Sequence, residues 1–153
     1  MAREINTTKA LEGTPRPHYL VGKATYEQED RTHLLRGTIH FSSENPSIGD
    51  RAEKYLLNPH VNSGDVCFAV WNGAHIIADL LGYSQRTLVN EINIVPHKPI
   101  PPDADLSLEV RVTEEANKID RNGKPYALGK VAGKIYLENN LLAEVNAGVF
   151  ARK

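Results

Sequence analysis

The stretch that decides the fold runs from Asn58 to Gly82 and reads NPHVNSGDVCFAVWNGAHIIADLLG. It begins with loop-forming residues and then continues, mostly apolar and without proline, to Gly82. Glycine is common just past a helix end and Ser63 is a good N-cap residue, so we expect a helix from Ser63 to Leu81. Apolar side chains surround it almost completely, which is typical of a buried helix. Its polar members lie seven, three and four residues apart and form one narrow seam: Asp65, Asn72, His75 and Asp79.

Strand patterns lie on both sides of this helix. Two strands are expected before it, at 18–26 and 33–41, as an antiparallel hairpin with a charged turn. Four strands are expected after it, at 88–95, 106–113, 126–137 and 142–151. The Pro-rich segment 96–102 forbids regular pairing, and the Asn-Gly pair within 120–123 is a strong hairpin turn. One helix with a mainly antiparallel sheet is an α+β fold.

We expect one domain over residues 1–153, in which the sheet curls around one long central helix. This is the hotdog arrangement. Residues 1–17 are polar and carry two prolines, so they are predicted to form a loose N-terminal arm or a short leading helix. Residues 42–62 are predicted to form a long loop with a short helix at 48–57, and long loops are often functional.

Composition limits the kind of protein. The 153 residues include 18 basic and 19 acidic side chains, and a net charge of −1 gives no reason to expect nucleic acid or a membrane surface as partner. A single cysteine excludes an internal disulfide and fits a reducing cytosol. No stretch is suited to a signal peptide or a membrane span, so we expect a soluble cytoplasmic protein. No cofactor fingerprint is present, and no cofactor is expected.

Three segments carry a resemblance to a known family: YLVGKATYE at 19–27, LLRGTIHF at 34–41 and AEKYLLNPHVNSGDVCFAVWNGAHIIA at 52–78. Together they resemble the FcoT-type family of hotdog fatty acyl thioesterases. The positions that match the family pattern are Tyr19-Leu20, Gly37, Tyr55, His60-Val61-Asn62 and Asn72. The segment VPHKPIPPDADLSLEVRV at 95–112 resembles a hotdog strand pair. Hotdog domains usually join sheets edge to edge, so the resemblance implies a homodimer or a higher even-numbered homo-oligomer with active sites near the subunit boundary.

The resemblance implies an acyl thioester substrate, carried by acyl carrier protein or coenzyme A. One branch of the family adds glycine to the β-carbon of a 2-enoyl thioester in natural-product biosynthesis, an aza-Michael addition, and can then hydrolyse the thioester. The leading hypothesis is that this chain does both, with glycine as co-substrate. The alternatives are a plain long- or medium-chain fatty acyl thioesterase and a non-catalytic acyl-binding hotdog protein.

The chemistry gives a reason to look at the helix start. Thioester hydrolysis and aza-Michael addition both place negative charge on the thioester oxygen, as a tetrahedral oxyanion or as an enolate. The first N–H groups of a helix have no acceptor within the helix, so those near Ser63 and Gly64 are suited to stabilise that charge. Gly64 allows close approach. Asn62 could orient the nucleophile or the thioester, or could simply be a turn residue or cap.

Three further residues are candidates for catalysis. His60 titrates near neutrality and could act as general base toward water or the glycine ammonium, although a histidine before a helix is more often a surface residue. Tyr55 could donate a hydrogen bond to a carboxylate or carbonyl, or pack within its loop. Asn72 must find partners inside an apolar helix, so it is either satisfied structurally or lines a pocket.

Other reactive residues have plainer interpretations. Asp65 is expected to stabilise the helix start rather than to replace the acidic residue of other hotdog thioesterases. Cys67 stands between Val66 and Phe68 and is expected to be an inert core thiol rather than a nucleophile. No metal site is expected, because the candidate ligands have no recognisable spacing: His33, His40, His60 and Asp65.

Overall fold

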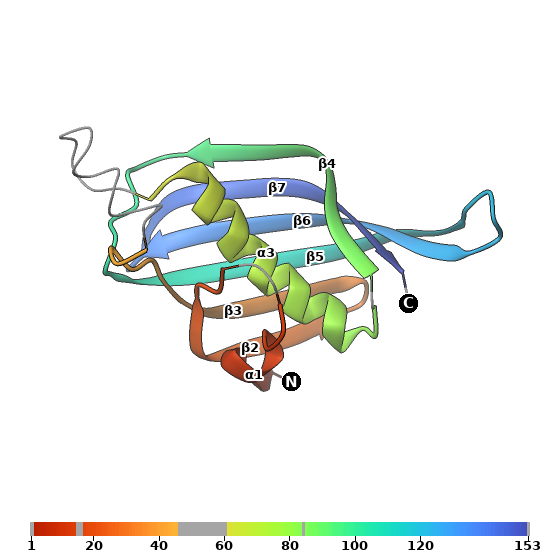
Figure 1. Ribbon diagram of the computed structural model, residues 1–153, viewed down its shortest axis with the longest axis horizontal. Coiled ribbons are helices and arrows are strands. Elements are labelled where there is room, and N and C mark those ends of the chain that lie inside the picture. The colour runs from red at the N-terminus through yellow and green to blue at the C-terminus, as the bar shows by residue number, and fades with distance from the viewer. Residues whose placement is uncertain (1, 15–16, 46–60, 84, 153) are drawn as a thin grey trace.

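The computed structural model describes residues 2–14, 17–45, 61–83 and 85–152, with the backbone alone for 85–91. One antiparallel sheet and one main helix form the fold (Figure 1). The elements, in chain order, are β1 (Arg3–Asn6), α1 (Thr7–Ala10), β2 (Leu20–Glu29), β3 (Thr32–His40), α3 (Ser63–Leu80), β4 (Gln85–Pro96), β5 (Asp105–Ile119), β6 (Pro125–Leu137) and β7 (Asn140–Arg152). The predicted helix at 48–57 and the residues Tyr55 and His60 lie outside the described residues.

The sheet has seven strands in the order β1-β2-β3-β5-β6-β7-β4, and every neighbouring pair is antiparallel. The six predicted strands are confirmed as β2 to β7. The alternation predicted on β5 is also confirmed, because Leu106, Leu108, Val110 and Val112 all point into the core. The hairpin turn before β6 ends at Gly123, which has a φ of 76° and so needs the conformational freedom of glycine.

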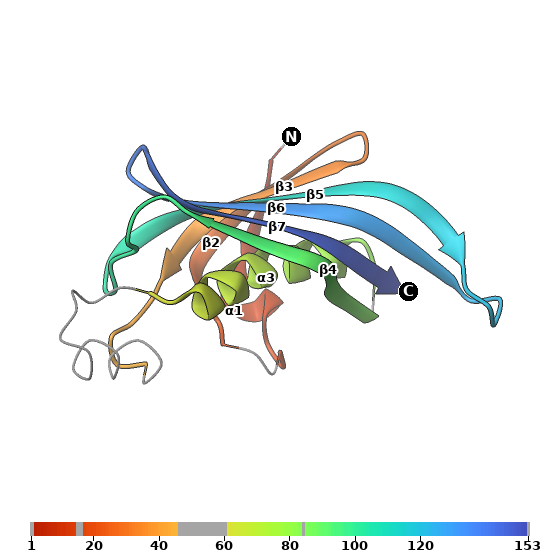
Figure 2. The same cartoon turned by 90° about the horizontal axis from the view of Figure 1, so that it is seen from above.

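α3 lies against the concave side of the curved sheet (Figure 2). It has 18 residues and ends at Leu80, one residue before the predicted end, and Gly82 follows with a φ of 81°. Two glycines let the helix approach closely. A Cβ added to Gly133 of β6 would lie 2.4 Å from a methyl of Val70, and one added to Gly73 would lie 2.6 Å from a methyl of Val110.

The first residues of the chain are more ordered than the sequence suggests. The short leading helix, one of the two predicted alternatives, is present as α1, whereas β1, which pairs with β2, stands in place of a loose arm. Ile5 and Leu11 are buried and anchor this segment, while the buried Thr7 hydroxyl donates to the Gly22 carbonyl at 2.8 Å. These side-chain contacts and the pairing with β2 hold the segment on the sheet edge.

The polar seam of α3 faces the chain between α1 and β2. Asn72 is fully buried and bonds the backbone at Tyr19 and Pro17, and the half-buried His75 lies 3.4 Å from the Thr14 hydroxyl. The seam is therefore occupied in part by this chain's own N-terminal segment, while Asp79, near the helix end, is exposed. None of the described helices has the length and apolarity needed to cross a lipid bilayer.

Candidate functional site

The start of α3 is closed by a side-chain cap. Asn62, with an extended backbone, accepts a hydrogen bond from the Asp65 amide at 3.0 Å and donates one to the Asp65 carboxylate at 2.5 Å. The N-cap is therefore Asn62, and the prediction that Ser63 fills this role is wrong by one residue. The physical reason is that an Asn can bond both the amide and the carboxylate of the residue three positions on, whereas Ser63 points outward and is exposed.

Asp65 is more than a helix-start residue. It is 5% exposed, and its second carboxylate oxygen accepts a short hydrogen bond from the Tyr19 hydroxyl. That hydroxyl in turn accepts from Asn45 at 3.2 Å, and the Tyr19 ring packs on Phe41 with centroids 4.7 Å apart. Four polar side chains from three separate segments thus meet beneath the helix start. A buried carboxylate needs such donors, and here each oxygen has one.

A cavity of about 430 Å³ borders the same end of α3. We call it the helix-start cavity. Its wall is made by the helix start, the end of β4 and the Pro-rich segment after β4: Val61, Asn62, Ser63, Val66, Ile94, Pro96, His97, Lys98, Pro99, Ile100 and Ala143. The Val61 amide donates to the Ile100 carbonyl at 2.9 Å, which ties the helix start to the Pro-rich segment.

Backbone donors are present at this cavity. The described residues supply no acceptor for the amides of Ser63 and Gly64, whereas the Asp65 and Val66 amides are satisfied by Asn62. A Cβ at Gly64 would lie 3.1 Å from the Asn62 side-chain oxygen, so glycine keeps the cap uncrowded. Ser63, whose amide is one of the two, is part of the cavity wall.

One histidine of the cavity wall was not foreseen. His97 lies in the Pro-rich segment, and its Nε2 is 2.8 Å from the Glu144 carboxylate. The sequence identified this segment only as a turn, and the partner Glu144 is 47 residues away along the chain. The sequence signal for His97 is a titratable side chain among prolines. Proline restricts the backbone, so it fixes the position of a neighbouring side chain. Lys98 follows in the same wall.

The structure separates the predicted site residues into two groups. Asn62 and Ser63 are together at the helix-start cavity, with Gly64 next to them. Asn72 lies two turns further on, and both ends of its side chain are engaged. Its oxygen accepts from the Tyr19 amide at 2.8 Å and its nitrogen donates to the Pro17 carbonyl at 3.1 Å. A role for Asn72 in orienting substrate therefore remains a prediction.

Cys67 is partly buried, and burial raises the pKa of its thiol. A raised pKa leaves less thiolate at neutral pH, so the thiol is less reactive. This supports the prediction of an inert cysteine.

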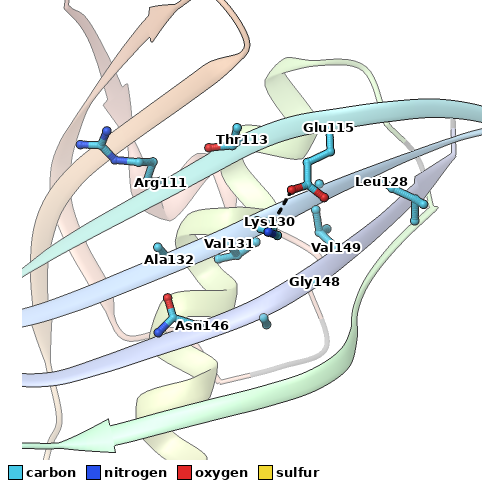
Figure 3. A pocket seen from close by; sticks show the side chains of 12 residues that line it. Arg111, Thr113, Glu115, Leu128, Lys130, Val131, Ala132, Asn146, Gly148 and Val149 are labelled. Carbon is cyan, nitrogen blue, oxygen red and sulfur yellow. Dashed lines mark ion pairs between the residues drawn. The ribbon is translucent and has the colours of Figure 1, made fainter.

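A larger hollow, of about 910 Å³, lies on the other face of the sheet, away from α3 (Figure 3). Side chains from β5, β6 and β7 border it, and Lys130 and Glu115 form an ion pair across it at 3.2 Å. Both of these side chains are well exposed to solvent. The hollow is open because small residues, Ala132 and Gly148, face it. None of the described buried polar residues lines this hollow, so it is a weaker candidate than the helix-start cavity despite its size.

No protein-family model matches the sequence, and no curated protein matches it significantly. Solved structures share the fold. A probable thioesterase from Bartonella henselae is 10% identical, with 78% of this chain and 91% of that one covered and a TM-score of 0.55. The protein yhdA from Lactococcus lactis is 10% identical, with 84% and 89% covered and a TM-score of 0.54. A phenylacetic acid degradation-related protein from Ralstonia eutropha JMP134 is 15% identical, with 95% and 99% covered and a TM-score of 0.50. The last two are also described, provisionally, as thioesterases. At these identities the likeness shows a shared α+β hotdog-like fold and nothing finer. A function must therefore be argued from the residues of the helix-start cavity.

Proposed function

We propose that this protein is an enzyme that binds an acyl thioester, carried by coenzyme A or by acyl carrier protein, at the start of α3 and hydrolyses it. The observation that carries the proposal is that Ser63 lines the helix-start cavity, and that the described residues supply no acceptor for the amides of Ser63 and Gly64. The fold-level likeness to proteins described as thioesterases supports the same chemistry.

In the proposed reaction the thioester oxygen accepts hydrogen bonds from the amides of Ser63 and Gly64. Water attacks the carbonyl carbon, its proton passes to a general base, and the oxygen becomes an oxyanion. Collapse of the tetrahedral intermediate breaks the C–S bond, and the leaving thiolate takes up the proton. A single donor of this kind contributes about 10²–10³ in rate in other acyl-transfer enzymes.

Two histidines are candidates for the general base. His60 is the residue predicted from the sequence, and it directly precedes Val61, which the Ile100 carbonyl holds in the cavity wall. His97 is in the wall itself, with Glu144 available to fix the orientation of its ring. We propose His60 as the base, in keeping with the family resemblance, and His97 as the residue against which it is to be tested.

A second candidate function is the addition of glycine to a 2-enoyl thioester. The resemblance motivates it, and one observation favours it: Lys98 is a lining residue of the helix-start cavity, and its ammonium could bind the glycine carboxylate. The enolate formed by addition places charge on the same thioester oxygen, so the Ser63 and Gly64 amides would serve both reactions.

The test is incubation of the protein with crotonyl-coenzyme A and with a crotonyl carrier protein, each with and without glycine, followed by mass spectrometry. Release of crotonate independent of glycine supports hydrolysis, and a product heavier by one glycine supports addition. No turnover of these or of longer saturated thioesters would refute both and leave a non-catalytic acyl-binding protein.

The base is assigned by three variants. We expect His60→Ala to lower kcat strongly, by about 10²-fold or more, because a general base contributes at least that much. His97→Ala should change kcat little, and His40→Gln, which removes an imidazole paired with Asp105 outside the cavity wall, is the control. A strong loss in His97→Ala alone would transfer the role to His97. Lys98→Met should raise KM for glycine without changing hydrolysis.

A further inference from the structure

A second cluster of titratable side chains lies near the other end of α3, on the helix side of the sheet. His33 of β3 is fully buried, and its two ring nitrogens have separate partners. Nε2 is 2.9 Å from the carboxylate of Glu114 on β5, and Nδ1 is 2.8 Å from the hydroxyl of Tyr26 on β2. Three strands thus combine to hold one carboxylate in a fixed orientation.

The order of donors and acceptors follows from the groups themselves. An ionised carboxylate can only accept, so Nε2 carries the proton toward Glu114. Nδ1 can then accept from the Tyr26 hydroxyl, so that both ring nitrogens of His33 have a partner. Within the described part of the chain, no lysine or arginine is paired with Glu114, and His33 is its one ion-pair candidate.

A second tyrosine supports the same carboxylate. Burial raises the pKa of the Tyr83 hydroxyl, and the charge and hydrogen bond of Glu114 raise it further. The hydroxyl therefore stays protonated beside the Glu114 carboxylate. Among the described residues, the groups beside Glu114 are a histidine and a tyrosine rather than a lysine or arginine, and a carboxylate has acceptor positions to spare.

Glu114 and Tyr83 line two adjoining cavities. The larger, of about 350 Å³, also has Asn117 and Ala127 in its wall. The smaller, of about 30 Å³, lies under the last turns of α3 and is almost entirely apolar, with Leu81 in its wall. The Glu114 carboxylate therefore lies where a larger cavity with a mixed polar and apolar wall meets an apolar recess, and a few polar groups in a mainly apolar wall are usual for a small-molecule site.

We propose that these two cavities form a binding site, the Glu114 cleft, for a small organic ammonium ion. The Glu114 carboxylate supplies the opposite charge, Tyr83 lines both cavities beside it, and the apolar recess takes a short alkyl group. α3 has 18 residues and is about 27 Å long at about 1.5 Å per residue. The Glu114 cleft is thus separate from the helix-start cavity, and the proposal does not rest on the proposed thioester chemistry.

The test is calorimetric titration of the whole protein with butylammonium chloride, with 1-butanol as the uncharged probe of similar shape. We expect saturable binding of butylammonium and at least about tenfold weaker binding of 1-butanol, because a hydrogen bond to a charged group contributes about that factor. Glu114→Gln should weaken butylammonium binding about ten- to a hundredfold. The matched control is Glu115→Gln, which removes the next carboxylate along β5, already paired with Lys130 on the opposite face.

Amide chemical shifts of the wild-type protein give a second readout that needs no variant. Butylammonium should shift the signals of Tyr83, Glu114 and Asn117 and leave those of Ser63 and Gly64 unchanged. The proposal is overturned if the wild type does not bind butylammonium, if 1-butanol binds equally well, if a folded Glu114→Gln binds as tightly as the wild type, or if the shifts gather at the helix start.

Discussion

Asn72→Ala tests what the one buried asparagine of α3 does. Its side chain is fully buried and bonds two backbone groups of the segment that leads into β2. The substitution leaves the buried Tyr19 amide without its acceptor, which costs about 1–3 kcal/mol. The Pro17 carbonyl is only partly buried and can turn to water, so its loss adds about 0.5–1.5 kcal/mol. We therefore expect the free energy of unfolding to fall by about 1.5–4.5 kcal/mol.

The assay is urea unfolding followed by fluorescence of Trp71, the single tryptophan, which neighbours the mutated position. Asn146→Ala, at an exposed position of β7, is the control and should change stability by no more than about 0.5 kcal/mol. A loss below about 0.5 kcal/mol for Asn72→Ala would refute the reasoning. If Asn72→Ala kept its stability but lost thioester turnover, Asn72 would act on substrate, as the family resemblance implies.

Three further predictions concern packing, pH and thiol reactivity. Gly133→Ala should lower the free energy of unfolding by about 1–3 kcal/mol in the same assay, because the new methyl meets Val70, and unchanged stability would contradict this packing. The Lys124 amide lowers the pKa of Asp120, so the stabilising effect of this carboxylate is complete above its ordinary pKa of about 3.9 and is lost as the pH falls through the lowered value. Asp120→Asn should therefore destabilise the protein at pH 7 and make little difference near pH 2, as thermal unfolding at several pH values can check, and an equal effect at both would exclude the linkage. Cys67 should react with iodoacetamide at least about tenfold more slowly in the folded protein than in urea, as mass spectrometry can follow, since burial raises its pKa, and equal rates would argue against its burial.

Much of the fold follows from periodicity. On β5 the buried residues Leu106 and Leu108 alternate with exposed Ser107. Apolar residues at every second position lie on one face of a strand, which predicts a half-buried strand. At the end of α3, Gly82 takes a left-handed conformation that most residues avoid, so the helix end could be placed within one residue. The N-terminal strand could not be foreseen, because Ile5 is its only buried residue and a single apolar position has no period.

The sequence could predict only those contacts of the candidate site that join residues close together in the chain. Asn62 and Asp65 are three residues apart, a spacing that allows a cap, although Ser63 is an equally good cap by type. The bond from Tyr19 to Asp65 joins residues 46 apart in the sequence, and no spacing rule connects them. The same holds for His97, whose place in the cavity wall depends on how the chain returns after β4.

The short strand β1 has a consequence for how far the sheet can extend. It closes part of one border of the sheet with four residues, two of them the charged Arg3 and Glu4, and so offers little backbone for another chain to recruit. β4, with 12 residues, forms the opposite border. If copies of this protein meet border to border, we expect them to do so through β4 alone. Pairing of β4 with β4 would give a closed dimer, and the β1 border would not allow a third copy to extend the sheet.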